Sequence, residues 1–217
     1  MFGWTHPQGC IGGNPEASHS TYDPVLLGAG AGFVEGTHVA SQQGWTPIED
    51  LRVGDKVLTF DNGAQKITSI VRNALWNGPG PCPESFWPLL IEEDTIGNGE
   101  EMLLMPHQGV LIESEEIMDH WGDPFAVIPA AALLILEGVE RCEPVEPVEI
   151  ILPVFETDQM VYADFGALLF CQAQWGVNAG VVPRQGMATN YNMLPRFVAE
   201  KLLAATYMCD NIDYDVA

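Results

Sequence analysis

The chain has 217 residues, of which 30 are acidic and 8 are basic, so its formal net charge is −22. This balance argues against direct binding to nucleic acid or to anionic membranes, because both depend on Lys and Arg facing phosphates. Apolar residues make up 47% of the chain, and 22 Gly with 16 Pro favour a turn-rich, mainly β fold with a sizeable core.

Residues 1–31 are predicted to form an irregular N-terminal arm, since HPQGCIGGNPEASHSTYDP has many turn formers and little periodicity. Phe2, Trp4 and Tyr22 are expected to bind a partner, because a few buried rings carry most of the energy of an interface. The first residues contain neither a basic segment nor an apolar run, so we expect synthesis in the cytoplasm without a signal peptide. No apolar stretch approaches the length of a membrane span.

Residues 32–176 are predicted to form a β-domain of short strands between turns. The sequence DNG at 61–63 is typical of a hairpin, because Asn-Gly readily adopts positive φ. Segments with the length and composition of strands are HVAS, KVLTF, KITSIVR, WPLLIE, EMLLM, GVLIES, FAVIP, VEIILPVF, QMVYA and ALLFC.

The strand KVLTF at 56–60 supplies an expectation about the core. Side chains alternate between the two faces of a strand, so Leu58 and Phe60 lie on the same face. We expect both to be buried together with Leu51 and Ile67.

Residues 177–217 are predicted to hold a linker, one C-terminal helix and an acidic tail. The apolar residues of LPRFVAEKLLAATYM, at 194–208, fall on one helical face, with Pro195 in the first turn, where proline is tolerated. This face can fold back on the β-domain or dock on another subunit, and Phe197 and Leu202 are its expected partner contacts.

The cysteines are widely separated along the chain. They are Cys10, Cys82, Cys142, Cys171 and Cys209. No CxxC spacing occurs, which argues against a zinc site and fits free thiols. We expect no cofactor and no metal, although His38 and His107 with acidic neighbours leave a metal site open as an alternative.

Four segments, in chain order, resemble one protein family. The first, GFVEGTHVASQQGWTPIEDLRVGDKVLTFDNG at 32–63, is the most specific, and EMLLMPHQGVLIES, FAVIPAAALLILEGV and VEIILPVFETDQMVYADFGA follow it. Together they resemble the Hint domain, the fold shared by hedgehog autoprocessing domains and inteins, and its bacterial branch of short stand-alone or multidomain proteins. The resemblance spans about residues 32–170 and implies a Hint-like fold of short strands and hairpins.

The resemblance also implies a chemistry. A Cys or Ser attacks the carbonyl just before it, and a His polarises or protonates the scissile bond. The nucleophile position falls at Gly32, the motif His at Gln108, and the two closing His positions at Leu152 and Asp158. None of these residues has the required chemistry, so we expect a degenerate active site and no enzyme activity.

A Hint-like domain without catalysis suggests a structural or interaction role. We expect a subunit of a large assembly, such as a virion, a tail or a gene-transfer-type particle. Its partners would be other protein subunits, including copies of itself. Two alternatives stay open: a self-cleaving Hint peptidase with an unrecognised nucleophile, and an acidic module whose surface binding depends on Ca²⁺.

Overall fold

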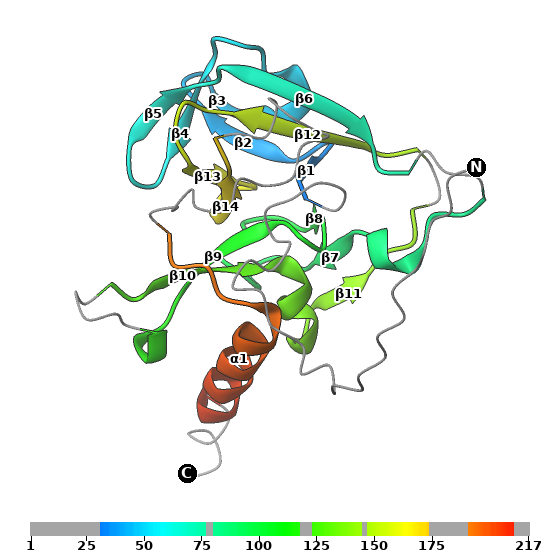
Figure 1. Cartoon of the computed structure of the whole chain (residues 1–217), viewed down its shortest axis with the longest axis vertical. Coiled ribbons are helices and arrows are strands. Elements are labelled where there is room, and N and C mark those ends of the chain that lie inside the picture. Colours follow the sequence, from blue (N-terminus) through cyan, green and yellow to red (C-terminus); the bar gives the residue numbers. More distant parts are fainter. Residues whose placement is uncertain (1–30, 77–79, 118–122, 145–146, 174–190, 211–217) are drawn as a thin grey trace, which may run out of the picture.

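The computed structural model describes residues 31–76, 80–117, 123–144, 147–173 and 191–210. These residues form a mainly β fold with a single long helix at the C-terminal end (Figure 1). The strands are β1 (Phe33–Val34), β2 (His38–Ser41), β3 (Gly44–Pro47), β4 (Lys56–Thr59), β5 (Gly63–Lys66), β6 (Ser69–Ala74), β7 (Leu89–Ile91), β8 (Met102–Leu104), β9 (Gly109–Glu113), β10 (Phe125–Pro129), β11 (Val139–Arg141), β12 (Glu149–Val154), β13 (Gln159–Ala163) and β14 (Ala167–Cys171). The helices are the short 3-10 turns η2 (Ile48–Asp50), η3 (Glu84–Phe86), η4 (Glu115–Ile117) and η5 (Ala130–Ile135), and the α-helix α1 (Arg196–Asp210).

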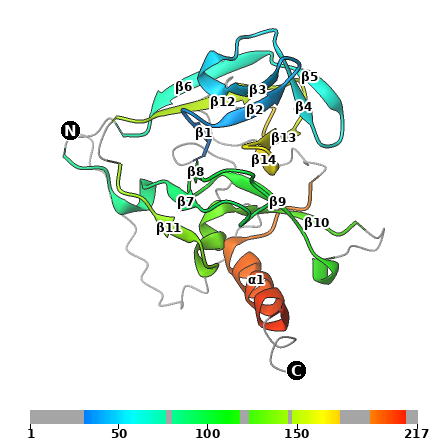
Figure 2. The same cartoon turned by 180° about the vertical axis from the view of Figure 1, so that it is seen from behind.

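The strands form two sheets whose described pairs are all antiparallel. One sheet has the order β11-β7-β8-β1-β12-β6, and the other has the order β10-β9-β14-β13-β2-β4-β5, with β3 paired to β2. Figures 1 and 2, taken from opposite sides, both place β7 to β11 in the half nearer α1 and β2 to β6 in the other half. The predicted mainly β fold with one C-terminal helix is confirmed.

Strand β1 lies in the middle of the six-stranded sheet. Phe33 is paired with Ile151 of β12 on one side and with Leu104 of β8 on the other. All three side chains are buried, at 2%, 0% and 1% exposure. Gly32, the residue that precedes β1, therefore lies next to a buried strand that is paired on both sides.

The predicted hairpin after KVLTF is present. Thr59 pairs with Gly63 across the turn between β4 and β5, and Gly63 has a φ of 62°. The Thr59 hydroxyl donates a hydrogen bond to the Gly63 carbonyl at 2.8 Å. Positive φ at this position is the reason that glycine follows asparagine here.

The face of β4 that is buried differs from our expectation. Leu58 and Phe60 are 45% and 37% exposed, whereas Val57 and Thr59 are 0% and 2% exposed. Thr59 tolerates burial because its hydroxyl is bonded within its own hairpin. The Phe60 ring instead packs at the surface, edge-on against Phe125 at 5.2 Å between centroids.

The corrected face leads to a prediction about stability. Val57→Ala should lower the free energy of unfolding by about 2 kcal/mol, because it removes buried methyl groups and leaves a cavity. Leu58→Ala should cost less than about 1 kcal/mol, since its side chain is half in water. Urea denaturation of both variants checks this, and an equal cost would contradict the assignment of the buried face.

The C-terminal helix packs on its own chain. The segment before it runs beside β10, where the Val127 amide donates to the Asn192 carbonyl at 2.8 Å and the Leu194 amide donates to the Val127 carbonyl at 2.9 Å. Leu202 is 8% exposed, so most of its side chain is covered by the chain itself. Within the described ranges, no helix is long and apolar enough to cross a bilayer.

Candidate functional site

Gly32 occupies the position at which the family's nucleophile is expected. It is buried, and its φ of 125° lies in a region that L side chains rarely adopt. Its amide nitrogen donates a hydrogen bond to Oε1 of Gln108 at 2.9 Å. The sequence-predicted positions Gly32 and Gln108 are therefore in direct contact, although they are 76 residues apart.

Gln108 is held by hydrogen bonds at both ends of its amide group. It is 2% exposed, and its Nε2 donates to the carbonyl of Phe170 at 2.9 Å and to that of Gly109 at 3.1 Å. The side chain thus bridges the start of β1 to β14. A carboxamide has no proton to give near neutral pH, so Gln108 cannot act as the general acid that the family's His supplies.

The space beside Gly32 is filled by apolar side chains. A Cβ atom built on Gly32 would lie 2.5 Å from Cγ2 of Ile150 and 3.0 Å from Cδ2 of Leu152. Real Cβ atoms essentially never approach other heavy atoms closer than 3.0 Å. The site therefore has no room for the side chain of a Cys or Ser in this arrangement.

The two positions expected for the closing His residues, Leu152 and Asp158, lie in different parts of the structure. Leu152 lies against Gly32, so one of the two closing His positions belongs to this site. Asp158 is engaged elsewhere: its Oδ1 accepts a hydrogen bond from the amide of Ala173 at 2.8 Å, after the end of β14. His107 is half-buried, and it is Gln108, its neighbour, whose side chain reaches Gly32.

The contacts of Gln108 lead to a second prediction. Gln108→Leu should lower the free energy of unfolding by about 1–3 kcal/mol for each buried group that loses its partner. The groups concerned are the Gly32 amide and the Phe170 carbonyl. Gln108→His, which can accept from one ring nitrogen and donate from the other, should cost clearly less. Urea denaturation distinguishes the two, and equal losses would mean that the hydrogen bonds are unimportant.

Two of the three described thiols, Cys82 and Cys171, are poorly suited to nucleophilic attack. Cys82 and Cys142 are half-buried and Cys171 is buried. Burial raises the pKa of the Cys82 thiol, and burial together with the charge of Asp158 raises the pKa of the Cys171 thiol far above its usual range. The thiolate is the reactive form, so these shifts oppose reactivity. Cys10 and the side chain of Cys209 are outside the described residues.

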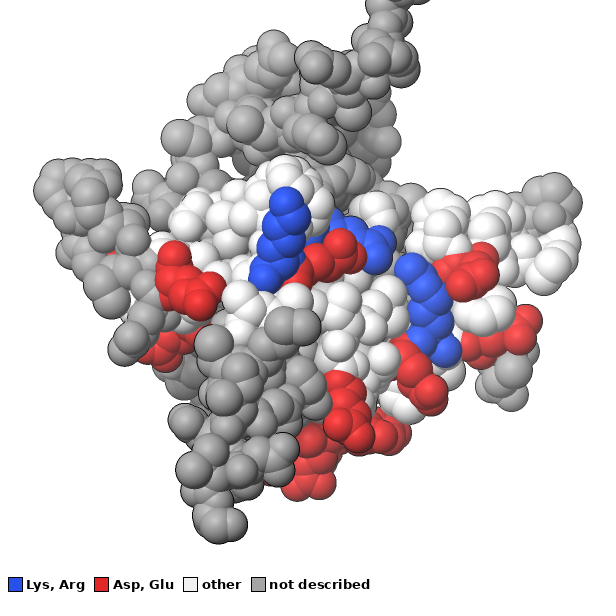
Figure 3. All heavy atoms as spheres, turned by 90° about the horizontal axis from the view of Figure 1, so that it is seen from below, with Lys and Arg blue, Asp and Glu red and all other residues white. Residues whose placement is uncertain are grey.

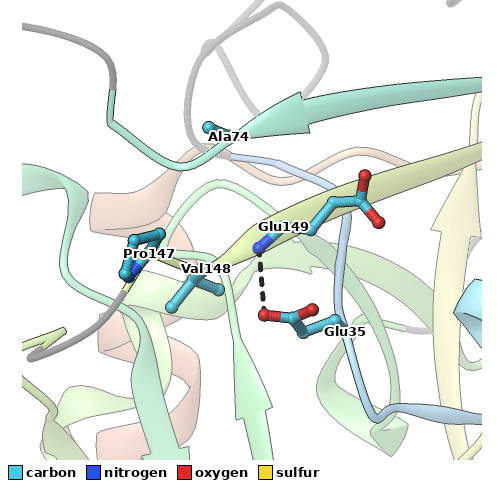
Figure 4. Close-up of a pocket in the computed structure, with 5 residues that line it drawn as sticks. All are labelled: Glu35, Ala74, Pro147, Val148 and Glu149. Carbon is cyan, nitrogen blue, oxygen red and sulfur yellow. Dashed lines mark hydrogen bonds between the residues drawn. The ribbon is translucent and has the colours of Figure 1, made fainter.

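A shallow hollow at the edge of the six-stranded sheet also contains carboxylates. It is lined by Glu35, Ala74, Pro147, Val148 and Glu149 (Figure 4). Glu35 accepts a hydrogen bond from the Glu149 amide at 3.3 Å, while the Glu149 side chain points away and binds Arg72 at 2.6 Å. The two carboxylates do not converge, so they do not form an acid–base pair.

The acidic residues form no metal cluster among the described residues: no group of three or more His, Cys, Asp or Glu side chains could hold an ion. On the face seen from below, acidic side chains are spread out, with Lys and Arg among them (Figure 3). His38 lies beside Asp164, with Nδ1 3.6 Å from Oδ1. The alternative of a metal site built on His38 and His107 gains no support from this arrangement.

Asp164 is a structurally important residue that the sequence analysis missed. It is 4% exposed, its Oδ1 accepts a hydrogen bond from the His38 amide at 2.7 Å, and its own amide donates to the His38 carbonyl at 2.8 Å. Burial raises the pKa of the Asp164 carboxyl, although the contacts with His38 oppose this shift. The only available signal in the sequence is a charged residue in the apolar context of VYADFGALLF.

The expected partner contacts are only partly within the described structure. Phe197 is 43% exposed on α1, and Leu202 is buried. Phe2, Trp4 and Tyr22 lie outside the described residues.

Comparison with known proteins gives the following matches. A family model described as a Hint domain matches residues 31–168. No curated protein matches the chain. The solution structure of a bacterial intein-like domain from Clostridium thermocellum is 14% identical, with 64% of this chain and 98% of that chain covered and a TM-score of 0.43. A splice-inactive variant of the AceL NrdHF class 3 split intein is 16% identical, with coverage of 65% and 97% and a TM-score of 0.39. The MchDnaB-1 intein is 13% identical, with coverage of 64% and 99% and a TM-score of 0.38.

Proposed function

This chain belongs to the Hint domain family, and on that premise we propose that it is a non-catalytic member that serves as a structural or interaction subunit of a larger assembly. The observation that carries the proposal is the arrangement around Gly32. The residue has no side chain, and Ile150 and Leu152 occupy the space that a side chain would need.

The family's acyl shift needs two things at this point. A nucleophile must reach the carbonyl of Ala31, and a proton must reach the departing nitrogen of Gly32. The nucleophile is missing at Gly32. The Gly32 N–H group donates a hydrogen bond to Oε1 of Gln108. This bond stabilises the planar amide, whereas cleavage requires the nitrogen to accept a proton as it leaves. The contacts of Gly32 with Ile150, Leu152 and Gln108 therefore oppose both the attack on the Ala31 carbonyl and the departure of the Gly32 nitrogen.

The self-cleaving alternative needs another nucleophile close to Ala31. Among the described cysteines, Cys171 is the one on β14, next to the Phe170 carbonyl that binds Gln108. Its raised pKa keeps it as an unreactive thiol. The Ca²⁺-dependent alternative needs converging carboxylates, and no such group occurs in the described ranges.

An assembly role is supported by apolar side chains that stay exposed on the folded domain. Besides Phe197, they include Trp45, Leu58, Phe60 and Phe165. Exposed aromatic side chains are enriched at protein interfaces. The partners we propose are other protein subunits, including copies of the same chain, in a particle such as a virion, a tail or a gene-transfer-type particle.

The assembly role is tested by isolating the chain from the cells that naturally make it. A C-terminal affinity tag and size-exclusion chromatography should yield the full-length chain in a complex that contains other protein subunits or several copies of itself. A single free chain with no associated protein would contradict the proposed function.

A further inference from the structure

Three aromatic rings meet at the surface beside the turn between β13 and β14. Phe165, in the turn, lies 4.7 Å from the ring of Trp45 on β3 and 5.7 Å from the ring of His38 on β2, measured between centroids. Trp45 is 38% and Phe165 is 40% exposed. The angle between the ring planes is 43° for Phe165 and Trp45 and 41° for Phe165 and His38, so the rings do not stack face to face.

The turn that carries Phe165 has an unfavourable backbone. Asp164 and Phe165 have φ values of 36° and 66°, a region that Gly and Asn adopt at much lower cost. Such conformations are unfavourable for residues other than Gly and Asn, and they are found mostly at functional sites. A half-exposed Phe regains only part of that cost through burial, so packing alone does not account for a Phe at this position.

The turn is held rigidly by the loop before β8. The Gly99 amide donates to the Asp164 carbonyl at 2.8 Å. Asn98 is fully buried, and its side chain binds the carbonyls of Glu92 and Glu100 at 2.9 and 2.8 Å. These bonds hold the backbone of the turn that carries Phe165, which reduces the entropy lost when a partner binds there.

We propose that His38, Trp45 and Phe165 form a docking surface for an arginine-bearing segment of another protein. A guanidinium group stacks well on Trp and Phe faces. The chain carries a net charge of −22, which attracts a cationic partner. Glu100 is exposed and directly follows Gly99, whose amide is bonded to the Asp164 carbonyl, so a carboxylate is available beside the turn that carries Phe165. This inference rests on the proposed interaction role and adds the surface and the chemistry of the partner.

The test is an NMR titration of the isotope-labelled full chain with the peptide Gly-Arg-Gly-Arg-Gly. Saturable shifts are expected at the amides of His38, Trp45 and Phe165. Phe165→Asn should weaken the affinity by about tenfold, because it removes the central stacking face, while its melting temperature stays the same or rises through relief of strain. The matched control Ile135→Asn, which changes another exposed apolar side chain (43%), should bind as the unchanged chain does.

Shifts spread over the acidic surface, or equal weakening in both variants, would show that charge alone attracts the peptide and would overturn the proposal. Absence of binding would also overturn it. A large fall in the melting temperature of Phe165→Asn would mean that the ring serves packing instead. None of these outcomes bears on the loss of catalysis or on co-isolation with other subunits, so failure of this inference is distinguishable from failure of the proposed function.

Discussion

Gly32→Cys is expected to lower the free energy of unfolding by about 2–6 kcal/mol and to leave the chain uncut. Positive φ imposes on the order of 1–3 kcal/mol on a side chain, and overpacking of a filled site adds about 1–3 kcal/mol. The second term follows from the 2.5 Å approach of the new Cβ to Ile150. Urea denaturation gives the stability, and mass spectrometry shows whether the bond before residue 32 is broken.

Gly36→Cys is the matched control for this variant. Gly36 has a φ of 90° and no atom within 4 Å of the position of its Cβ, so the substitution introduces the strain without the clash. It should cost only about 1–3 kcal/mol. If Gly32→Cys were as stable as Gly36→Cys and were cut efficiently, the rest of the site would be competent, and the account of Gln108, Ile150 and Leu152 as obstacles to the reaction would be wrong.

Gly166→Ala is expected to cost at least about 3 kcal/mol, at the upper end of the range for overpacking. Its Cβ would lie 2.0 Å from the carbonyl oxygen of Gly97. That oxygen belongs to a backbone segment fixed by the buried Asn98 and by the hydrogen bond from Gly99 to Asp164, so it cannot move without breaking these contacts. The same damage should also disorder the aromatic surface at Phe165.

The control for Gly166→Ala is Gly44→Ala, at a position with a φ of 106° and open space around its Cβ. This control should cost about 1–2 kcal/mol through backbone strain alone. Thermal or urea denaturation ranks the two variants. A Gly166→Ala variant as stable as the unchanged chain would show that the loop and the turn are not packed as described.

The order and type of the strands could be predicted from the sequence, because alternation and β-branched residues are local properties. The buried face of β4 could not be predicted in this way. KVLTF places Leu and Phe on one face and Val and Thr on the other, and composition favours burying the first pair. Two bonds of the Thr59 hydroxyl, to the Gly63 carbonyl and from the Asn62 amide, make its burial inexpensive, and both depend on the turn geometry.

The candidate site was predictable to the extent that it follows the motif. The family pattern predicts that Gly32, Gln108 and Leu152 occupy one site, and they do meet. The pattern gives no information on what a glutamine does once it replaces a histidine, nor on Asp158, whose partner Ala173 lies 15 residues away. The hydrogen bonds between His38 and Asp164 join residues that are 126 positions apart in the sequence, and no local pattern can reveal such a contact.

Intact mass spectrometry of the freshly purified chain, before and after long incubation with dithiothreitol or hydroxylamine, tests the loss of self-cleavage most directly. Thiols and hydroxylamine cleave the thioester or ester that an acyl shift would form before Gly32. Because Gly32 has no nucleophile and its amide is bonded to Gln108, no fragment that begins at Gly32 is predicted under any condition. Hydroxylamine also cuts Asn-Gly bonds, of which the chain has three, and those fragments are recognised by their different masses. A fragment that begins at Gly32 and increases with added thiol or hydroxylamine would contradict the account.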